Sequence, residues 1–419
     1  MPTISAKPDH FLILDVGTTG IKAFVFNAKF EIKARAYRPL KTKRPKRDWV
    51  EQDPMEILTI SKQVIKEAVR ASQIRLNHFA AFGLATQRET VIAWDRVTGR
   101  PVYPAIGWED RRSDRGIKAL KGVSGVEAMV REKTGLALDP YFSASKIQWI
   151  LENRFSERST NQAIASIMLR FQNFCVGTVD SWLLWNLCEG EPHLTDETNA
   201  ARTLLFDIKK RQWDSELLKL FGVPREILPE VFPSGAEYGL LKKEIMGARL
   251  PVLAVIGDQQ ASTYAAGIKV GSTKVTYGTG AFLVQSLGHK FKIIPGFFTT
   301  LLPTISGQPI FALEAKVENC AASVEPVLKN PKKLKAALLK IARQVDKAIK
   351  KLPTKPKFII ADGGVMRDGI IIEQQTKVSD LPVRPQAVFD GTALGVVKLV
   401  SEVFKRKYAN RHRTSRMGL

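Results

Sequence analysis

The feature that most constrains the fold is a strand–turn–strand pattern that occurs twice, once near the start of each half of the chain. The first copy places the turn DVGTTG, residues 15–20, between the apolar runs 11–14 and 23–26. The second copy, residues 272–286, contains the turn YGTG at 277–280. Glycines let the backbone reverse sharply, so each copy predicts a β-hairpin. The two copies share a pattern and not a sequence, and they predict two lobes of similar architecture facing one cleft.

The first of these turns has the composition of a phosphate-binding loop. Backbone N–H groups and the hydroxyls of Thr18 and Thr19 can contact phosphate oxygens, and Lys22 adds a positive charge. Asp15, at the end of the first predicted strand, could bind Mg²⁺ through water. An ordinary hairpin with turn-forming Gly and Thr explains the same residues, and this stretch alone does not separate the two interpretations.

A carboxylate follows a predicted buried strand in the middle of the chain. The apolar run 250–256 ends at Gly257, and Asp258 comes directly after it. Loops at strand ends carry chemistry in α/β proteins, so Asp258 is a candidate general base. For an isolated aspartate, a role as N-cap of a helix beginning near Ser262 is the commoner explanation. The other motifs of the chain decide between these interpretations.

Three further stretches place polar or aromatic side chains at the ends of predicted elements. Arg88 and Glu89 follow the predicted strand 80–87, where a guanidinium and a carboxylate can donate to and accept from neighbouring hydroxyls of a polyol. Trp108 could form an apolar wall against the carbon chain of such a substrate, and Tyr141 could project its phenol into a cleft. A surface ion pair and core packing are the structural alternatives for these residues.

Composition and charge limit the class of protein. The 419 residues predict two or three domains, and the three cysteines are too widely spaced for a disulfide framework or a C-x-x-C metal pair. We therefore expect a reducing, cytoplasmic compartment, and no apolar run approaches the roughly 18 residues that a membrane span needs. The net charge of +23 favours anionic partners. No nucleic-acid-binding motif is present, so we expect no specific nucleic-acid partner.

Taken together, nine motifs give the chain a family resemblance. In order they are DVGTTG, WVEQDP, TQRET, DPYFS, GTVDSWLLW, TNAARTLLF, GDQQA, YGTGAF and DGG. With them the chain resembles the FGGY carbohydrate kinases, and within that family most closely the glycerol kinases. The resemblance runs from about residue 11 to 328 and resumes from about 332 to 400.

The resemblance implies a fold and an activity. The fold is α/β, with two ribonuclease-H-like (actin-like ATPase) lobes around a central cleft: an N-terminal lobe at 1–252, a C-terminal lobe at 253–403 and a basic tail at 404–419. The activity is ATP-dependent phosphorylation of glycerol to glycerol 3-phosphate, with Asp258 as general base and MgATP bound between the lobes. The alternatives are an FGGY kinase for another polyol or sugar, and a catalytically impaired polyol-binding regulatory protein. The sequence leaves open assembly into a homo-oligomer.

The resemblance also implies site residues, position by position. The implied polyol site consists of Arg88, Glu89, Trp108, Tyr141, Asp258, Gln259 and Phe282. The implied contacts to ATP come from Thr18, Thr19, Lys22, Thr279, Gly280, Gly363, Gly364 and Asp368, and Asp15 lies near Mg²⁺.

The second lobe departs from the family pattern. Family members carry a glycine-bearing segment where this chain has Ala315 and Ala321, and a PYWD-containing stretch is missing before the helix predicted at 332–352. No glycine occurs from Ala312 to Ala361. We therefore expect MgATP to bind mainly through its phosphates, with few contacts to adenine.

Overall fold

The computed structural model describes residues 8–155, 173–278, 281–317, 327, 330–366, 369–386 and 390–409. The chain forms two compact units. Unit 1 comprises Met1–Ala261, Pro303–Gly307 and Thr392–Leu419, and unit 2 comprises Ser262–Leu302 and Gln308–Gly391. The domain limits expected from the sequence, at 252 and 403, stay a prediction.

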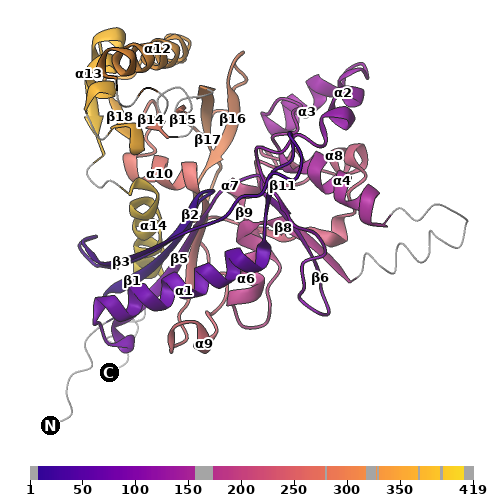
Figure 1. Cartoon of the computed structure of the whole chain (residues 1–419), viewed down its shortest axis with the longest axis vertical. Coiled ribbons are helices and arrows are strands. Elements are labelled where there is room, and N and C mark those ends of the chain that lie inside the picture. Colours follow the sequence, from indigo (N-terminus) through magenta and orange to yellow (C-terminus); the bar gives the residue numbers. More distant parts are fainter. Residues whose placement is uncertain are drawn as a thin grey trace, which may run out of the picture. The chain divides into compact units, whose positions relative to one another are not determined.

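Unit 1 is built on a five-stranded sheet in the order β13–β5–β1–β2–β3 (Figure 1). Its strands are β1 (His10–Val16), β2 (Gly20–Asn27), β3 (Ile32–Pro39), β5 (Phe79–Thr86) and β13 (Val252–Gly257). β1, β2 and β3 form an antiparallel meander, whereas β5 pairs parallel to both β1 and β13. Parallel strands end at the same edge of a sheet, so the residues that follow β5 and β13 lie side by side.

Helices pack against the strands of this sheet. α1 (Pro54–Ser72) packs against β2 and β3, and Asp53 caps its start, with its side chain accepting a hydrogen bond from Met55 N at 2.8 Å. α14 (Gly391–Ala409) approaches β5 at Gly83, where an added Cβ would lie 2.5 Å from side-chain atoms of Val396 and Val400. Gly83 therefore allows close helix–strand packing.

A second sheet in unit 1 has the order β4–β7–β6–β8. It contains β4 (Glu51–Gln52), β7 (Ala105–Ile106), β6 (Val91–Asp95) and β8 (Phe174–Thr178). The sequence predicts one amphipathic helix over 176–187, and this is wrong at its start. Residues 174–178 pair with β6 instead, and α6 (Val179–Leu187) is buried along almost its whole length. An all-round apolar helix and a buried strand give similar sequence runs.

The remaining elements of unit 1 connect these sheets. They are η1 (Leu76–His78), α2 (Asp114–Lys121), α3 (Val126–Thr134), α4 (Ser143–Phe155), β9 (Leu194–Asp196), α7 (Glu197–Ala200), β10 (Phe206–Asp207), β11 (Gln212–Trp213), α8 (Ser215–Phe221), η2 (Arg225–Ile227), β12 (Glu230–Phe232) and α9 (Lys243–Met246).

Unit 2 is built on a six-stranded sheet in the order β16–β17–β15–β14–β18–β19. The strands are β14 (Thr273–Tyr277), β15 (Ala281–Gly288), β16 (Phe298–Leu302), β17 (Ile310–Val317), β18 (Ile359–Asp362) and β19 (Val383–Pro385). α12 (Pro331–Ile349) packs against β15, β17 and α13 (Ile370–Ser379), and η4 (Gly364–Met366) follows β18.

Both units repeat one topology, which confirms the predicted fold class. In each, a hairpin (β1–β2 or β14–β15) is extended by antiparallel pairing on one side and by two parallel strands on the other; the antiparallel side has β3 in unit 1 and β17 followed by β16 in unit 2. Ala315 lies buried in β17 opposite Leu283, so this departure from the family pattern leaves the sheet intact. Within the described ranges, no helix has the length and apolarity to cross a membrane.

Candidate active site

The edge of the unit 1 sheet where β5 and β13 end gathers three charged side chains. Arg88 and Glu89 lie two and three residues after β5, and Asp258 follows β13 without a gap. The sequence places Asp258 in a loop before a helix near Ser262; in the structure it is the first residue of α10 (Asp258–Ala266). The helix therefore begins earlier than the sequence indicates and follows β13 without a connecting loop.

Arg88 is the centre of this group. Its Nε lies 3.4 Å from Asp258 Oδ1 and 3.9 Å from Glu89 Oε2, and its Nη1 donates to Gln260 Oε1 at 3.3 Å. Gly257 makes room for it, because a Cβ there would lie 2.9 Å from both Arg88 Cδ and Gln260 Oε1. The Arg88 guanidinium therefore lies between the carboxylates of Asp258 and Glu89, next to the end of β13.

Glu89 is held from its other side by Arg202. Arg202 Nε donates to Glu89 Oε1 at 2.6 Å, and the two side chains are 0% and 2% exposed. Glu89 also has a backbone φ of 61°, a left-handed conformation that is uncommon for a non-glycine residue. Asp258, Arg88, Glu89 and Arg202 therefore form a row of alternating charges, which lets four ionised groups share a largely buried site.

The electrostatics of Asp258 suit a general base. Burial raises its pKa to about 6, against the lowering effect of Arg88, while Glu89 and Asp15 raise it further. The side chain is nevertheless 27% exposed, so a reactant can reach it. A carboxylate with this pKa is mostly ionised near neutral pH and more basic than an ordinary aspartate.

Aromatic residues form a second wall of the site. The rings of Trp108 and Tyr141 meet edge to face with centroids 5.6 Å apart, and Trp108 Nε1 donates to Thr18 Oγ1 at 2.9 Å. The Thr18 hydroxyl in turn donates to Gln87 Oε1 at 3.4 Å. The Arg202 guanidinium lies 5.6 Å from the centre of the Tyr141 ring. The wall of Trp108 and Tyr141 therefore contacts the β1–β2 turn through Thr18 and the charged row through Arg202.

A buried lysine fixes the backbone that carries Tyr141. Lys146 Nζ donates to the carbonyl oxygens of Pro140, Tyr141 and Phe142 at 2.8, 2.6 and 3.1 Å. Burial lowers the pKa of Lys146 to about 7, while Glu89 is the first of the carboxylates that oppose this shift. Three carbonyl acceptors match the three protons of an ammonium group.

The predicted residues of the β1–β2 turn differ in their burial and in their hydrogen bonds. Asp15 is buried at the end of β1, with Lys22 Nζ 3.7 Å from its Oδ2. Gly17 N donates within the turn to Gly20 O at 3.0 Å, and Thr18 bonds to Trp108. Thr19 is the exposed threonine of the pair. Their contacts to phosphate stay a prediction.

Of the other predicted residues, Gln259 belongs to unit 1 and the rest belong to unit 2. Phe282 is half-buried on β15, and Gln259, on α10 in unit 1, donates its backbone N–H to Asp258 Oδ1 at 2.7 Å. Gly363 has φ 108°, and a Cβ there would lie 2.2 Å from Tyr277 O, whereas a Cβ on Gly364 would meet no atom of the described residues within 4 Å. Thr279, Gly280 and Asp368 lie outside the described residues.

The turn at Gly363 is anchored by a buried ion pair. Lys274 Nζ donates to Asp362 Oδ1 at 2.8 Å and also to the Thr276 hydroxyl, and Asp362 accepts a further hydrogen bond from Ser262. This ion pair was not predicted from the sequence, because 88 residues separate its members.

Sequence reasoning also missed the residues that hold the site from behind. Arg202, Gln260 and Lys146 contact predicted site residues but received no role. Two of them occur in the motifs TNAARTLLF and GDQQA, so a signal was present. The pairing of Arg202 with Glu89 across 113 residues could not be inferred from spacing.

Comparisons with known proteins identify the family of the chain. Residues 10–265 match the N-terminal domain of the FGGY family of carbohydrate kinases. The chain is 40% identical over 318 residues to "Glycerol kinase 2" of Thermotoga maritima and 44% identical over 310 residues to the glycerol kinase of Shewanella frigidimarina. These matches cover 75% and 74% of this chain but 62% and 60% of those relatives. The chain thus spans about three fifths of their length.

Solved structures extend the likeness to the whole fold. A crystal structure of Plasmodium falciparum glycerol kinase with ADP aligns with a TM-score of 0.84 and 25% identity, covering 94% of this chain and 90% of that one. A xylulose kinase from Lactobacillus acidophilus aligns with a TM-score of 0.81 and 16% identity, covering 95% and 90%. The second likeness concerns the fold alone.

Proposed function

Because the chain belongs to the FGGY family of carbohydrate kinases, we propose that it transfers the γ-phosphoryl group of ATP to a terminal hydroxyl of glycerol. The observation that carries the proposal is the row Asp258–Arg88–Glu89–Arg202 beside the Trp108–Tyr141 wall. The names of the relatives support glycerol as the acceptor, and the ADP in the Plasmodium enzyme supports ATP as the donor.

The proposed polyol site divides recognition between charges and rings. Arg88 donates to one hydroxyl and Glu89 accepts from its neighbour, which favours a vicinal diol. Trp108 and Tyr141 cover the carbon atoms, and Gln259 and Phe282 complete the proposed contacts. Arg202 acts through Glu89 as a positioning residue, because it fixes the carboxylate from behind.

The proposed chemical step is a single in-line displacement. Asp258 accepts the proton of the attacking hydroxyl while that oxygen forms a bond to the γ-phosphorus, and the bond between the γ-phosphorus and the bridging oxygen breaks to release ADP. Arg88 holds Asp258 in position at 3.4 Å and lowers the cost of its negative charge. Positioning and charge stabilisation supply most of the acceleration in such transfers.

The proposed nucleotide and metal contacts come from both units. Asp15 offers a hard carboxylate oxygen of the kind that Mg²⁺ prefers, next to the exposed Thr19 and to Lys22. The metal would supply neutralisation of phosphate charge. In unit 2 the open space at Gly364 suits close approach of a nucleotide, with Thr279, Gly280, Gly363 and Asp368 as further proposed contacts.

A coupled assay of ADP release with glycerol, erythritol, xylulose and gluconate tests the proposal. We expect turnover that requires ATP and is greatest with glycerol. Preference for another acceptor would favour a different FGGY kinase. Glycerol binding without turnover would favour the polyol-binding protein, an alternative that the departures in the second lobe support.

A further inference from the structure

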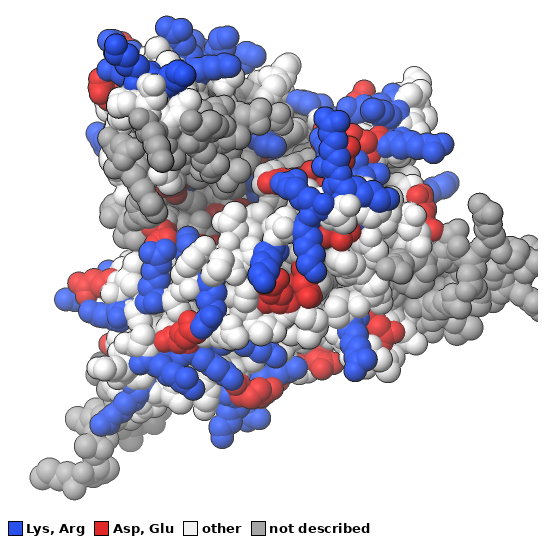
Figure 2. Space-filling model, in the orientation of Figure 1, with Lys and Arg blue, Asp and Glu red and all other residues white. Residues whose placement is uncertain are grey.

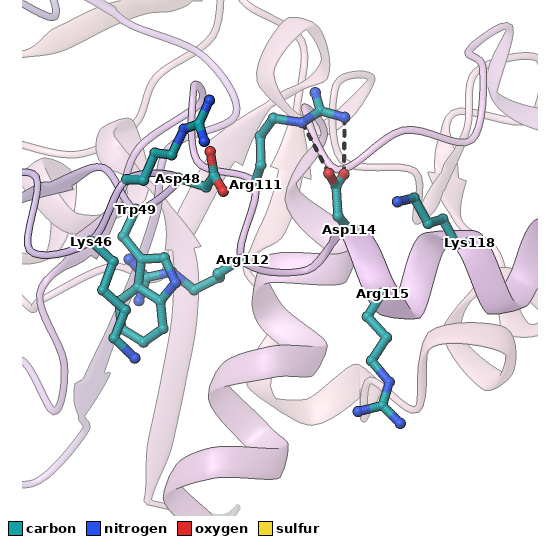
Figure 3. Close-up of a pocket in the computed structure, with 9 residues that line it drawn as sticks. Lys46, Asp48, Trp49, Arg111, Arg112, Asp114, Arg115 and Lys118 are labelled. Carbon is teal, nitrogen blue, oxygen red and sulfur yellow. Dashed lines mark hydrogen bonds and ion pairs between the residues drawn. The ribbon is translucent and has the colours of Figure 1, made fainter.

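Unit 1 contains a pocket built from residues that the proposed kinase reaction does not use. Its volume is about 540 Å³, and two segments form it: the loop 46–49 and the stretch from Arg111 into α2 (Figure 3). This volume lies within the range of small-molecule sites. The lining residues are Lys46, Arg47, Asp48, Trp49, Arg111, Arg112, Asp114, Arg115 and Lys118.

Some of the lining charges are satisfied within the protein. Arg111 makes two bonds to Asp114, from Nε at 3.1 Å and Nη2 at 2.9 Å, which Figure 3 shows as dashed lines. Arg112 Nη2 lies 2.8 Å from carboxylate oxygens of both Glu51 and Asp110. These two arginines form the fixed wall of the pocket.

Four other cations of the lining have no such compensation. In the part of the chain that the structure describes, Lys46, Arg47, Arg115 and Lys118 take part in no ion pair, and all four are exposed. Asp48 is the one lining carboxylate left to offset them. The pocket therefore carries an excess of about three positive charges that a bound anion would neutralise.

Two of these cations belong to α2 and two to the loop 46–49. Arg115 and Lys118 lie three residues apart on α2, and Arg111 precedes the helix; all three line the pocket. Residues three apart on a helix are neighbours, so the like charges of Arg115 and Lys118 repel each other in the absence of a counter-ion. Across the pocket, Lys46 Nζ lies 4.2 Å from the centre of the Trp49 ring.

The aromatic ring of this pocket is already occupied. The Arg112 guanidinium lies 3.9 Å from the centre of the Trp49 ring, and the ring of Trp149 meets that of Trp49 at 5.3 Å. With Lys46 also over the ring, Trp49 already makes two cation–π contacts within the protein. Recognition by charge alone fits phosphate groups, which Arg binds in a bidentate manner and Lys as a point charge.

We infer that this basic pocket binds a small molecule with two or more phosphate groups. One phosphate would lie against Arg115 and Lys118 on α2, and another against Lys46 and Arg47 on the loop. The inference is independent of the proposed kinase activity, since neither segment supplies a residue to the phosphoryl transfer.

Calorimetry with inorganic tripolyphosphate in EDTA-containing buffer tests the inference, because chelation disfavours the Mg²⁺-dependent nucleotide site. We expect the wild-type chain to bind, and Arg115→Gln/Lys118→Gln to weaken binding at least about tenfold. Lys332→Gln/Lys335→Gln is the matched control. It removes two exposed cations at the same three-residue spacing from α12, outside the pocket.

Three results would overturn the inference. Absence of tripolyphosphate binding by the wild type is the first. The second is an equal loss of affinity in both double variants, which would indicate general attraction by the net charge. The third is a loss of short-duplex DNA binding in Arg115→Gln/Lys118→Gln without any change in tripolyphosphate binding, which would assign the patch to nucleic acid. Melting curves of both variants verify that they fold.

Discussion

Asp258 combines two features whose effects on its pKa oppose each other. Its recessed position raises the pKa, and the nearby guanidinium of Arg88 lowers it. The balance, at about 6, keeps the carboxylate ionised at neutral pH yet basic enough to accept a proton from a hydroxyl as that oxygen attacks phosphorus. A fully solvated aspartate would be the weaker base.

This pKa predicts the acid limb of the pH profile. Because the ionised form is the base, activity is present above pH 6 and is lost as the pH falls. We expect kcat/KM for glycerol to drop about tenfold per unit below the pKa. Initial rates measured from pH 5 to 8 in buffers of constant ionic strength will show this limb. A flat profile over that range would exclude Asp258 as the group that must be ionised.

Arg202 should matter for stability as well as for substrate binding. Arg202→Met leaves the Glu89 carboxylate buried without its 2.6 Å partner, so we expect a loss of about 3 kcal/mol in the free energy of unfolding. Adding Glu89→Gln should restore part of it, because the uncompensated charge disappears. All seven tryptophans lie at or before Trp213, so tryptophan fluorescence during urea unfolding reports on unit 1. Strictly additive losses in the double variant would contradict this coupling.

Among the elements, the turn after β18 offers a matched pair of glycines. Gly363→Ala places a Cβ 2.2 Å from Tyr277 O at φ 108°, and backbone cannot move aside cheaply. Gly364→Ala places its Cβ in open space. We expect the first substitution to destabilise unit 2 by at least about 2 kcal/mol and the second by less than about 1 kcal/mol.

Hydrogen exchange of the β14 and β18 amides measures this difference without relying on activity. Faster exchange in Gly363→Ala alone is the expected result. Similar exchange in both variants would mean that the contact with Tyr277 is not what requires glycine at 363. In Gly364→Ala we also expect a higher KM for ATP and an unchanged KM for glycerol.

Elements with a strong local signal were predictable. The hairpins β1–β2 and β14–β15 follow from apolar runs around glycine turns, and the start of α1 follows from Asp53 and Pro54. The boundary between β8 and α6 could not be predicted from the sequence, because both elements are buried and equally apolar. Local patterns also placed Asp258, Arg88 and Glu89 at strand ends. They could not show that these strands share an edge, nor that Arg202 lies behind Glu89, since both depend on tertiary packing.

On the scale of the whole molecule, positive charge is widespread but uneven. Figure 2 shows Lys and Arg spread over the visible face with Asp and Glu among them. Most of the net charge of +23 therefore favours anionic ligands only weakly and in a salt-dependent way. The basic pocket differs because several cations without ion-pair partners among the described residues line one volume.

The departures in the second lobe predict weak recognition of adenine. No glycine occurs from Ala312 to Ala361, and side chains hold a backbone farther from a bound ring. Losing contacts of about 1 kcal/mol each should weaken ATP binding roughly ten- to a hundredfold, with little discrimination between ATP and GTP. Calorimetry with MgATP and MgGTP in the Arg115→Gln/Lys118→Gln background avoids a contribution from the basic pocket. Tight, adenine-selective binding would contradict this expectation.

Turnover of glycerol by the Asp258→Asn variant decides whether the charged row is a catalytic site. Asparagine keeps the shape of the side chain but cannot accept the proton, and removing a general base typically costs 10²–10⁴ in rate. The wild-type chain should phosphorylate glycerol at the expense of ATP, and Asp258→Asn should reduce kcat at least about a hundredfold while glycerol binding, followed by calorimetry, is largely retained. Near-normal turnover in Asp258→Asn would contradict the assignment of Asp258 as the base.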